Sequence, residues 1–253
     1  MQNKKVLLGM SGGVDSTVAA ILLKEQGYEV IGATMELWQD ENRKLESGCC
    51  SSSAVDDAKK ICNILKIPHY TLDFKNEFRK CVIKDFINCY KNAKTPNPCI
   101  ECNKHLKFNY FYKKALELGC KYIATGHYAK VEFNEEYNQY VLKKSNAIHK
   151  DQSYVLYNIP KEIVQNILFP LSEFETKEQI RQIAEKHNLK VAKKPDSQEI
   201  CFIPDNNYSR FLLENLTEEP LQGDIIDKQG NVLGKHKGLI NYTIGQRKGL
   251  RYI

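Results

Sequence analysis

The feature that most constrains the fold is a glycine-rich turn between an apolar strand and a helix near the start of the chain. Val6 to Met10 is an apolar run, and Ser16 to Gln26 has helical spacing with Gly27 placed to end the helix. Glu29 to Glu36 then predicts a second strand. Strands that alternate with helices form parallel sheets, because each parallel return needs a crossover. We therefore predict an α/β fold with a doubly wound parallel sheet.

The same alternation continues through the first 130 residues. Further strands are predicted over Ile67–Leu72 and Tyr122–Thr125, and further helices from Ser53, a capping residue, to about Leu65, over Glu77–Asn92 and over Asn109–Leu118. Thr176, with Gln179 three residues later, forms a capping box for a helix to about His187.

The pattern changes after about residue 203. Short β-like segments lie around Ile225 and Val232, on either side of turn residues 227–231. A chain of 253 residues is long for one domain and short for two large ones. We expect a main domain over residues 1–203 and a small mixed domain over residues 204–253.

Composition narrows the class of protein. With 42% hydrophobic and 27% charged residues, the chain has the composition of a globular protein and not of a disordered one. It contains no apolar run long enough to span a bilayer and does not begin with a signal peptide, so we expect a cytoplasmic protein without a membrane partner. Its nine cysteines should then be reduced, and any special ones catalytic, redox-active or metal-binding. The net charge of +6 permits a polyanionic partner.

The glycine-rich turn has the chemistry of a phosphate site. Its residues are Gly9, Met10, Ser11, Gly12, Gly13, Val14, Asp15 and Ser16. Glycines let backbone amides curl around an anion, the following helix adds positive potential, and the two serine hydroxyls can donate hydrogen bonds. A P-loop would need Lys followed by Ser or Thr, and the glycine spacing does not match the dinucleotide fingerprint. Both of those nucleotide folds are disfavoured.

The glycine-rich turn resembles the PP-loop of the ATP pyrophosphatase superfamily. Five further runs of sequence narrow this resemblance to one family. The runs are Gly48-Cys49-Cys50-Ser51, Thr95–Lys104, Thr125–Ala129, Lys150–Tyr154 and Ser197–Phe202. Together, and in this order over essentially the whole chain, they resemble the tRNA-specific 2-thiouridylases, the MnmA family.

The resemblance implies a set of ligands and binding residues. It implies that Gly9 to Ser16 hold the phosphates of ATP, which binds with Mg²⁺, and that Met35 and Gly126 border the adenine. The residues implied at the target base are Asn97, Pro98 and Cys99, and those implied at the tRNA are His127, Lys150, Asp151 and Gln152. The implied partners are tRNA with lysine, glutamate and glutamine acceptors, and a sulfur donor such as a cysteine desulfurase or a sulfur-relay protein.

Two cysteines carry the implied chemistry: Cys102 as the catalytic cysteine and Cys201 as the persulfide carrier. The 2-carbonyl oxygen of uracil is a poor leaving group, so adenylation would turn it into a phosphate ester, and the persulfide would then deliver sulfur. Cys102 would release that sulfur and leave a Cys102–Cys201 disulfide for reduction. Lys104, His105 and a helix start beside Cys102 would raise its thiolate fraction.

Other interpretations of these residues stay open. Cys99, Cys102 and Cys201 would be three ligands for an iron–sulfur cluster, which we do not favour. Alternatively, Cys99 and Cys102 would be half of a zinc site in an RNA-binding module, or the turn would belong to a PP-loop ligase or amidotransferase. Cys62, Cys81, Cys89 and Cys120 are expected to pack in the core. The resemblance also expects a carboxy-terminal β-barrel after Ile253.

Overall fold

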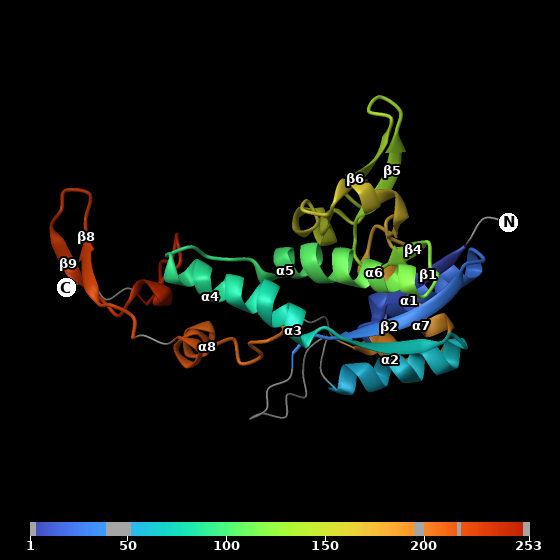
Figure 1. Ribbon diagram of the computed structural model, residues 1–253, viewed down its shortest axis with the longest axis horizontal. Coiled ribbons are helices and arrows are strands. Elements are labelled where there is room, and N and C mark those ends of the chain that lie inside the picture. The colour runs from blue at the N-terminus through green and yellow to red at the C-terminus, as the bar shows by residue number, and fades with distance from the viewer. Residues whose placement is uncertain (1–3, 39–51, 195–199, 217–218, 250–253) are drawn as a thin grey trace.

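Five parallel strands form the central sheet of the computed structural model, which describes residues 4–38, 52–194, 200–216 and 219–249 (Figure 1). The strands are β1 (Lys5–Gly9), β2 (Glu29–Glu36), β3 (His69–Asp73), β4 (Tyr122–Ala124) and β7 (Ile167–Leu168), in the order β3-β2-β1-β4-β7. The chain winds one way from β1 to β3 and the other way from β4 to β7. This confirms the doubly wound parallel sheet, although β7 was not predicted.

Helices cover both faces of the sheet, because successive side chains of a strand point to opposite faces and both faces are apolar. Val6 and Leu8 are buried on the face covered by α1 (Val14–Glu25), α2 (Ser52–Leu65) and α7 (Lys177–Lys186). Leu7 is buried on the opposite face, where the aromatic residues of the two long helical segments gather. A period of two therefore separates two apolar cores. The predicted capping box of α7 is present, with Thr176 and Gln179 bonded reciprocally.

The two long helical segments contain π-helical turns. The first is α3 (Lys75–Phe78), η1 (Arg79–Ile83) and α4 (Lys84–Lys91), close to the prediction. The second is α5 (Pro98–Glu101), η2 (Cys102–Tyr110) and α6 (Phe111–Glu117). It begins eleven residues before the predicted start at Asn109, because the Asn97 side chain accepts a hydrogen bond from the Cys99 amide at 3.1 Å and Pro98 fills the first turn. Cys102 thus lies inside a helix.

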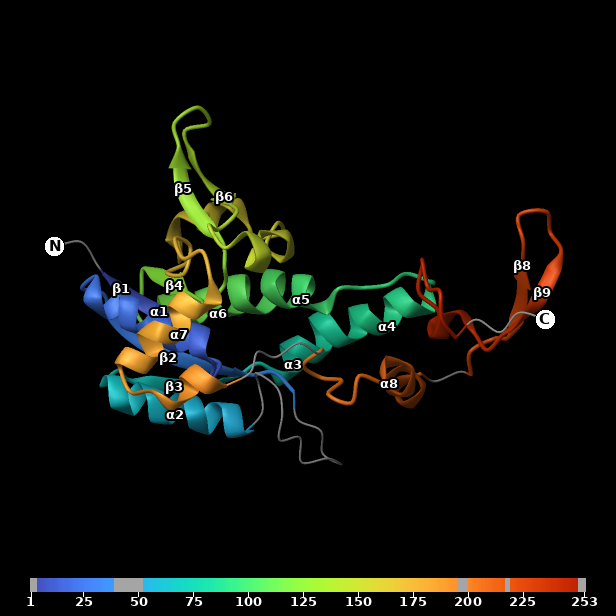
Figure 2. The ribbon, with the colours of Figure 1, turned by 180° about the vertical axis from the view of Figure 1, so that it is seen from behind.

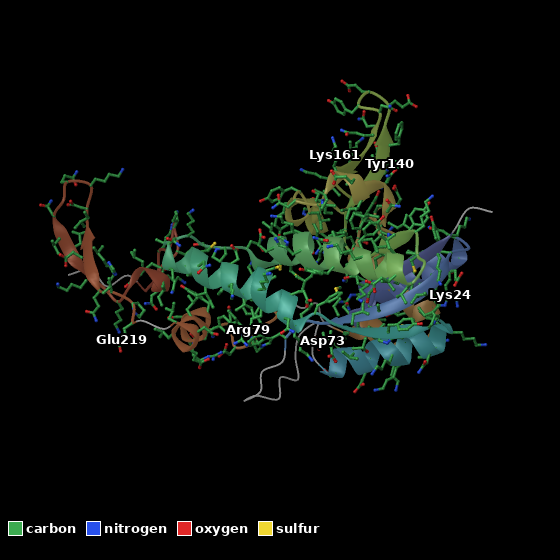
Figure 3. All side chains as sticks on the ribbon, viewed as in Figure 1. Lys24, Asp73, Arg79, Tyr140, Lys161 and Glu219 are labelled. Carbon is green, nitrogen blue, oxygen red and sulfur yellow. The ribbon has the colours of Figure 1, made fainter. Side chains whose placement is uncertain are left out.

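A hairpin that the sequence did not predict projects from the sheet. It consists of β5 (Lys130–Asn134) and β6 (Gln139–Lys143), with Phe133 opposite Tyr140. Figure 3 shows Tyr140 on this hairpin, well away from the sheet. No strand or helix was predicted from the sequence between Thr125 and Thr176, so this hairpin was missed.

The carboxy-terminal part is a small second unit at the far end of the molecule (Figures 1 and 2). Its hairpin of β8 (Gly223–Ile226) and β9 (Val232–His236) was predicted, and the Asp227 carboxylate holds the turn by accepting the Gln229 and Asn231 amides at 2.9 and 2.8 Å. Helix α8 (Tyr208–Asn215) was not predicted. No helix in the described part of the chain is long and apolar enough to cross a membrane.

Phe202 connects residues 200–216 to the first long helical segment. Its ring centroid lies 5.6 Å from that of Phe78, 5.3 Å from that of Phe86 and 5.2 Å from that of Phe211. The side chain is 3% exposed. Such aromatic clusters contribute through both area burial and edge-to-face contact. Phe202 therefore fixes the position of the neighbouring Cys201.

Replacement of this anchor should destabilise the protein. Phe202→Ala should lower the free energy of unfolding by about 3–5 kcal/mol, because it removes a buried ring and leaves a cavity. Urea denaturation followed by fluorescence measures the change. Tyr157→Ala, at a side chain that is 66% exposed, is the matched control and should cost below about 0.5 kcal/mol. Equal effects of the two substitutions would contradict the anchoring role.

Candidate functional site

The main candidate site is a cavity of about 310 Å³ at the carboxyl ends of β1 and β4. Sheet order reverses between these strands, which is where ligands bind in doubly wound folds. Of the residues predicted from the sequence, the cavity is lined by Gly9, Met10, Ser11, Asp15, Ser16, Met35, Pro98, Cys99, Cys102, Gly126, His127, Gln152 and Cys201. One cavity thus joins the glycine-rich turn to the candidate target-base residues and to both candidate reactive cysteines.

The remaining predicted residues lie off this cavity. They are Gly12, Gly13, Val14, Asn97, Lys150 and Asp151. Gly12 lines an adjoining pocket together with three lysines, Lys60, Lys190 and Lys194. Cys49, Cys50 and Ser51, and residues 197–199, lie outside the described residues. The cavity also takes in residues that sequence reasoning did not single out, namely Thr34, Leu37, Phe78, Val82, Lys107, Thr125, Ile200 and Phe202.

Close packing explains two of the glycines. Gly12 has a φ of +67°, and a Cβ there would lie 2.7 Å from the Ala54 carbonyl oxygen. At Gly126, which follows β4, a Cβ would lie 2.9 Å from the Asp15 Cβ. The loop after β4 therefore touches the glycine-rich turn directly. Within the turn, the Ser11 amide donates to the Ser16 hydroxyl at 3.2 Å, which holds both serines at the cavity.

Asp15 lies in a bonded cluster that draws on three parts of the chain. Its carboxylate accepts the Tyr128 hydroxyl at 2.8 Å and the Lys177 ammonium at 2.5 Å. The Lys177 side chain is 8% exposed, and its ammonium lies 5.8 Å from the centroid of the Tyr128 ring. The capping box of α7 fixes Lys177 at the first helical position. The sequence predicted that a helix starts at this point, but no motif linked Lys177 to Asp15, which lies 162 positions away.

His127 is held as a neutral imidazole. Its Nδ1 lies 2.7 Å from the Thr125 hydroxyl oxygen, and its ring contacts Phe108 and Phe169. Burial lowers the pKa of His127 well below its ordinary value, and the charge of Lys107 lowers it further. The uncharged ring can take part in hydrogen bonding or stacking but does not provide a positive charge to the cavity.

Gln152 and Asp151 have different local roles. The Gln152 side-chain oxygen accepts a hydrogen bond from the Tyr128 backbone amide at 3.0 Å, and the Gln152 backbone amide donates to the Tyr128 carbonyl at 2.8 Å. These bonds place Gln152 on the cavity beside the Asp15 cluster. The Asp151 carboxylate accepts the Ser145 amide at 2.9 Å and the Ser153 hydroxyl at 2.6 Å. Asp151 therefore stabilises the loop that carries Gln152.

The three candidate cysteines differ in exposure. Cys102 is buried, Cys201 is half-buried and Cys99 is exposed. Lys107 is the lysine among the described lining residues, and neither Lys104 nor His105 lines the cavity. His105 instead pairs with Glu101 at 3.2 Å. The helix that was expected to start beside Cys102 begins four residues earlier, at Pro98, and the effect of Lys104 and His105 on the Cys102 thiolate stays a prediction.

The other described cysteines are packing residues or lie away from the cavity. Cys62 and Cys120 are buried, as predicted, and burial raises the pKa of Cys62 to about 12. Cys81 and Cys89 are half-buried on the first long helical segment. Among the residues that the structure describes, no group of three or more His, Cys, Asp and Glu side chains is arranged to hold a metal ion.

Comparison with known proteins identifies relatives along the whole chain. A family model described as "tRNA methyl transferase HUP domain" matches residues 4–205, and one described as "tRNA methyl transferase PRC-barrel domain" matches residues 209–252. A tRNA-specific 2-thiouridylase MnmA of Clostridioides difficile is 54% identical over 249 residues. Another, of Caldicellulosiruptor saccharolyticus, is 57% identical over 250 residues. Each alignment covers 98% of this chain and 69% of the relative.

Among solved structures, an NMN synthetase from Francisella tularensis is similar to this chain with a TM-score of 0.47 and 16% identity. The similarity covers 78% of this chain and 67% of the synthetase. We draw no functional conclusion from a similarity at this level.

The ion pair between Lys177 and Asp15 should give a measurable coupling energy in the free energy of unfolding. Removing one partner of a largely buried ion pair costs about 3–5 kcal/mol, so Lys177→Met should be strongly destabilising. Adding Asp15→Asn to that variant should cost much less than Asp15→Asn alone, with a coupling energy of at least about 1 kcal/mol in a double-mutant cycle. Urea denaturation of the four proteins measures the cycle. Additive effects would mean that the pair does not hold α7 to the glycine-rich turn.

Proposed function

This chain belongs to the tRNA-specific 2-thiouridylase family, and from that membership we propose that it uses ATP to place sulfur at C2 of the wobble uridine of tRNA. The family comprises tRNA sulfurtransferases, and the alignments extend over 98% of this chain. The finer steps proposed here are adenylation of the uracil 2-carbonyl oxygen and transfer of sulfur from a cysteine persulfide.

One observation carries the proposal. The glycine-rich turn and the two cysteines Cys102 and Cys201 line a single cavity, although the cysteines are far apart in the sequence. An ATP-dependent ligase would have no use for both cysteines at its nucleotide site, and a zinc-stabilised RNA-binding module would have no use for the turn. Sulfur transfer to an adenylated base uses both features in one place.

The first step needs a bound nucleotide. Backbone amides of the turn and the hydroxyls of Ser11 and Ser16 would hold the phosphates, with Met35 and Gly126 beside the adenine. Mg²⁺ that enters with ATP would neutralise further negative charge on the phosphates. Asp15 is the carboxylate of the turn that could orient the turn or help to hold this ion. The uracil O2 attacks the α-phosphorus, a new P–O bond forms, and the bond to pyrophosphate breaks. AMP then activates C2 as a phosphate-ester leaving group.

The second step moves sulfur between the cysteines. The terminal sulfur of a Cys201 persulfide attacks C2, and AMP leaves with its electron pair. The Cys102 thiolate then attacks the Sγ atom of Cys201 and breaks the S–S bond, so the outer sulfur is reduced to that of 2-thiouridine. The two cysteines are oxidised to a disulfide, which a thiol reductant reopens. The position of both cysteines on one cavity supports this pairing.

The substrates and partners follow from the same proposal. We propose tRNAs with lysine, glutamate and glutamine acceptors as substrates, and a cysteine desulfurase or sulfur-relay protein as the donor. Asn97, Pro98 and Cys99 would meet the target base, and His127, Lys150, Asp151 and Gln152 would meet the tRNA. We also propose that the catalytic domain is residues 1–203 and that residues 204–253 begin a second domain. The change of matched family model between residues 205 and 209 supports this division.

An iron–sulfur cluster is the second candidate for sulfur handling, because Cys99, Cys102 and Cys201 line one cavity. The described side chains, however, include no three-residue group arranged to hold a metal. The proposed reaction therefore contains no step that uses a cluster.

Substitution of each cysteine should separate the proposed steps. Cys201→Ser should abolish persulfide loading and 2-thiouridine formation but leave tRNA-dependent pyrophosphate release measurable. Cys102→Ser should accept sulfur at Cys201 but stop turnover, because the bound sulfur is not released. Persulfide labelling, pyrophosphate release and mass spectrometry of tRNA nucleosides, in cells that lack the chromosomal gene, measure the three steps. Wild-type levels of 2-thiouridine with Cys201→Ser would contradict the persulfide step.

Cys99→Ser distinguishes the two schemes, because a cluster would use Cys99 as a ligand, whereas in the persulfide scheme Cys99 only contacts the target base and serine keeps a side chain of similar size. It should keep most of the thiolation activity, and protein purified without oxygen should be active without iron. Loss of activity in Cys99→Ser together with stoichiometric iron in the wild-type protein would establish the cluster instead.

A further inference from the structure

The proposed adenylation builds up negative charge in a cavity whose described lining contains one lysine. Among the described residues that line it, Lys107 is the only lysine or arginine, and His127 is neutral. The other charged lining residue is Asp15, whose carboxylate is bonded to Tyr128 and Lys177. A phosphoryl group that reacts here therefore has Lys107 as its source of positive charge from the cavity wall.

The π-helical turn explains why Lys107 lies on the cavity with Cys102. In a regular α-helix, with 3.6 residues per turn, a residue five positions on lies about 140° around the axis and faces away. The wider π-helical turn, with i to i+5 bonding, brings the fifth residue back towards the first. Segment η2 begins at Cys102 and runs to Tyr110. Both Cys102 and Lys107 consequently line the cavity, whereas Lys104 does not.

Neighbouring contacts fix this part of the helix. The side-chain amide of Asn103, which is 1% exposed, donates to the Val155 carbonyl at 3.0 Å. Leu106 and Phe108, on either side of Lys107, are fully buried. These contacts set the rotation of η2, so the position of Lys107 is imposed by the packing of its neighbours.

Lys107 shares the cavity with residues from both halves of the proposed reaction. It lines the cavity together with Gly126 and His127, which follow the carboxyl end of β4, and its charge contributes to the lowered pKa of His127. Its helix carries Cys99 and Cys102 on the sulfur side. The α-phosphate joins the nucleotide to the target base during the proposed adenylation, so it would lie in the cavity that these groups share.

We propose that Lys107 contacts the α-phosphate of ATP and stabilises adenylyl transfer to the base. This rests on the proposed function. As uracil O2 bonds to the α-phosphorus and pyrophosphate leaves, negative charge builds up on the phosphoryl oxygens, and a preorganised ammonium offsets it. Lys107 donates hydrogen bonds and transfers no proton. In this step the AMP unit becomes bonded to uracil O2, pyrophosphate leaves with the electron pair of the broken P–O bond, and the proton of uracil N3 is lost to solvent. The lysine again faces the phosphate when AMP departs from C2.

The test compares Lys107→Met, Lys107→Arg and Lys104→Met in the full chain. Lys107→Met should lower kcat for tRNA-dependent pyrophosphate release by about 10²-fold, while KM for ATP changes by less than about tenfold. Lys107→Arg, which keeps the charge, should recover much of the rate. Lys104→Met lies on the same helix but off the cavity, and its rate should stay within about twofold of wild type.

Each outcome separates this inference from the function on which it rests. Unchanged kcat for Lys107→Met, in a wild-type background that releases pyrophosphate, would overturn the role of Lys107 alone. Absence of pyrophosphate release from the wild-type protein with tRNA and ATP would contradict the proposed function itself. If Lys107→Met raised only the Kd for tRNA, with an unchanged rate at saturating tRNA, Lys107 would contact tRNA and the inference would be wrong. An equal loss with Lys107→Arg and Lys107→Met would likewise refute a role for its charge.

Discussion

All five strands of the sheet end at one edge because they are parallel, and the direction of winding reverses between β1 and β4. This reversal leaves the loops after β1 and β4 side by side without a crossover between them. Gly126 after β4 approaches Asp15 so closely that a Cβ would not fit. The Asp15 cluster then ties the first turn of α1 to Tyr128 and to Lys177 at the start of α7. The cavity depends on this junction.

A second constraint brings the sulfur chemistry to the same place. The long helical segment that begins at Pro98 passes the cavity and changes to π-helical geometry at Cys102. Cys201 reaches the cavity because Phe202 is packed among the aromatic side chains of the first helical segment and α8. The two cysteines thus come from separate packed elements, and the nucleotide turn comes from a third. Their meeting is a property of the fold rather than of any one motif.

Local patterns predicted much of this arrangement. The alternation of apolar strands and helices predicted the doubly wound sheet, and the glycine-rich turn and the capping box at Thr176 were recognised because they depend only on neighbouring residues. The start of the helix at Pro98 was missed although Asn97 and Pro98 are ordinary start signals, since the helix was predicted only from Asn109. Lys107 and Lys177 were missed for a different reason. The position of Lys107 depends on a π-helical turn, and that of Lys177 depends on a contact with a residue far away in the sequence. Neither feature produces a residue spacing that could be recognised in the sequence.

The central claim is that nucleotide and reactive cysteines share one cavity, and protection from alkylation tests it most directly. Alkylation of each cysteine by iodoacetamide is followed by mass spectrometry, with and without saturating ATP and Mg²⁺. Bound nucleotide should slow modification of Cys102 and Cys201, which line the cavity, and leave modification of Cys89, which does not line it, unchanged. Equal alkylation rates of Cys102 and Cys201 with and without bound ATP would contradict a shared cavity.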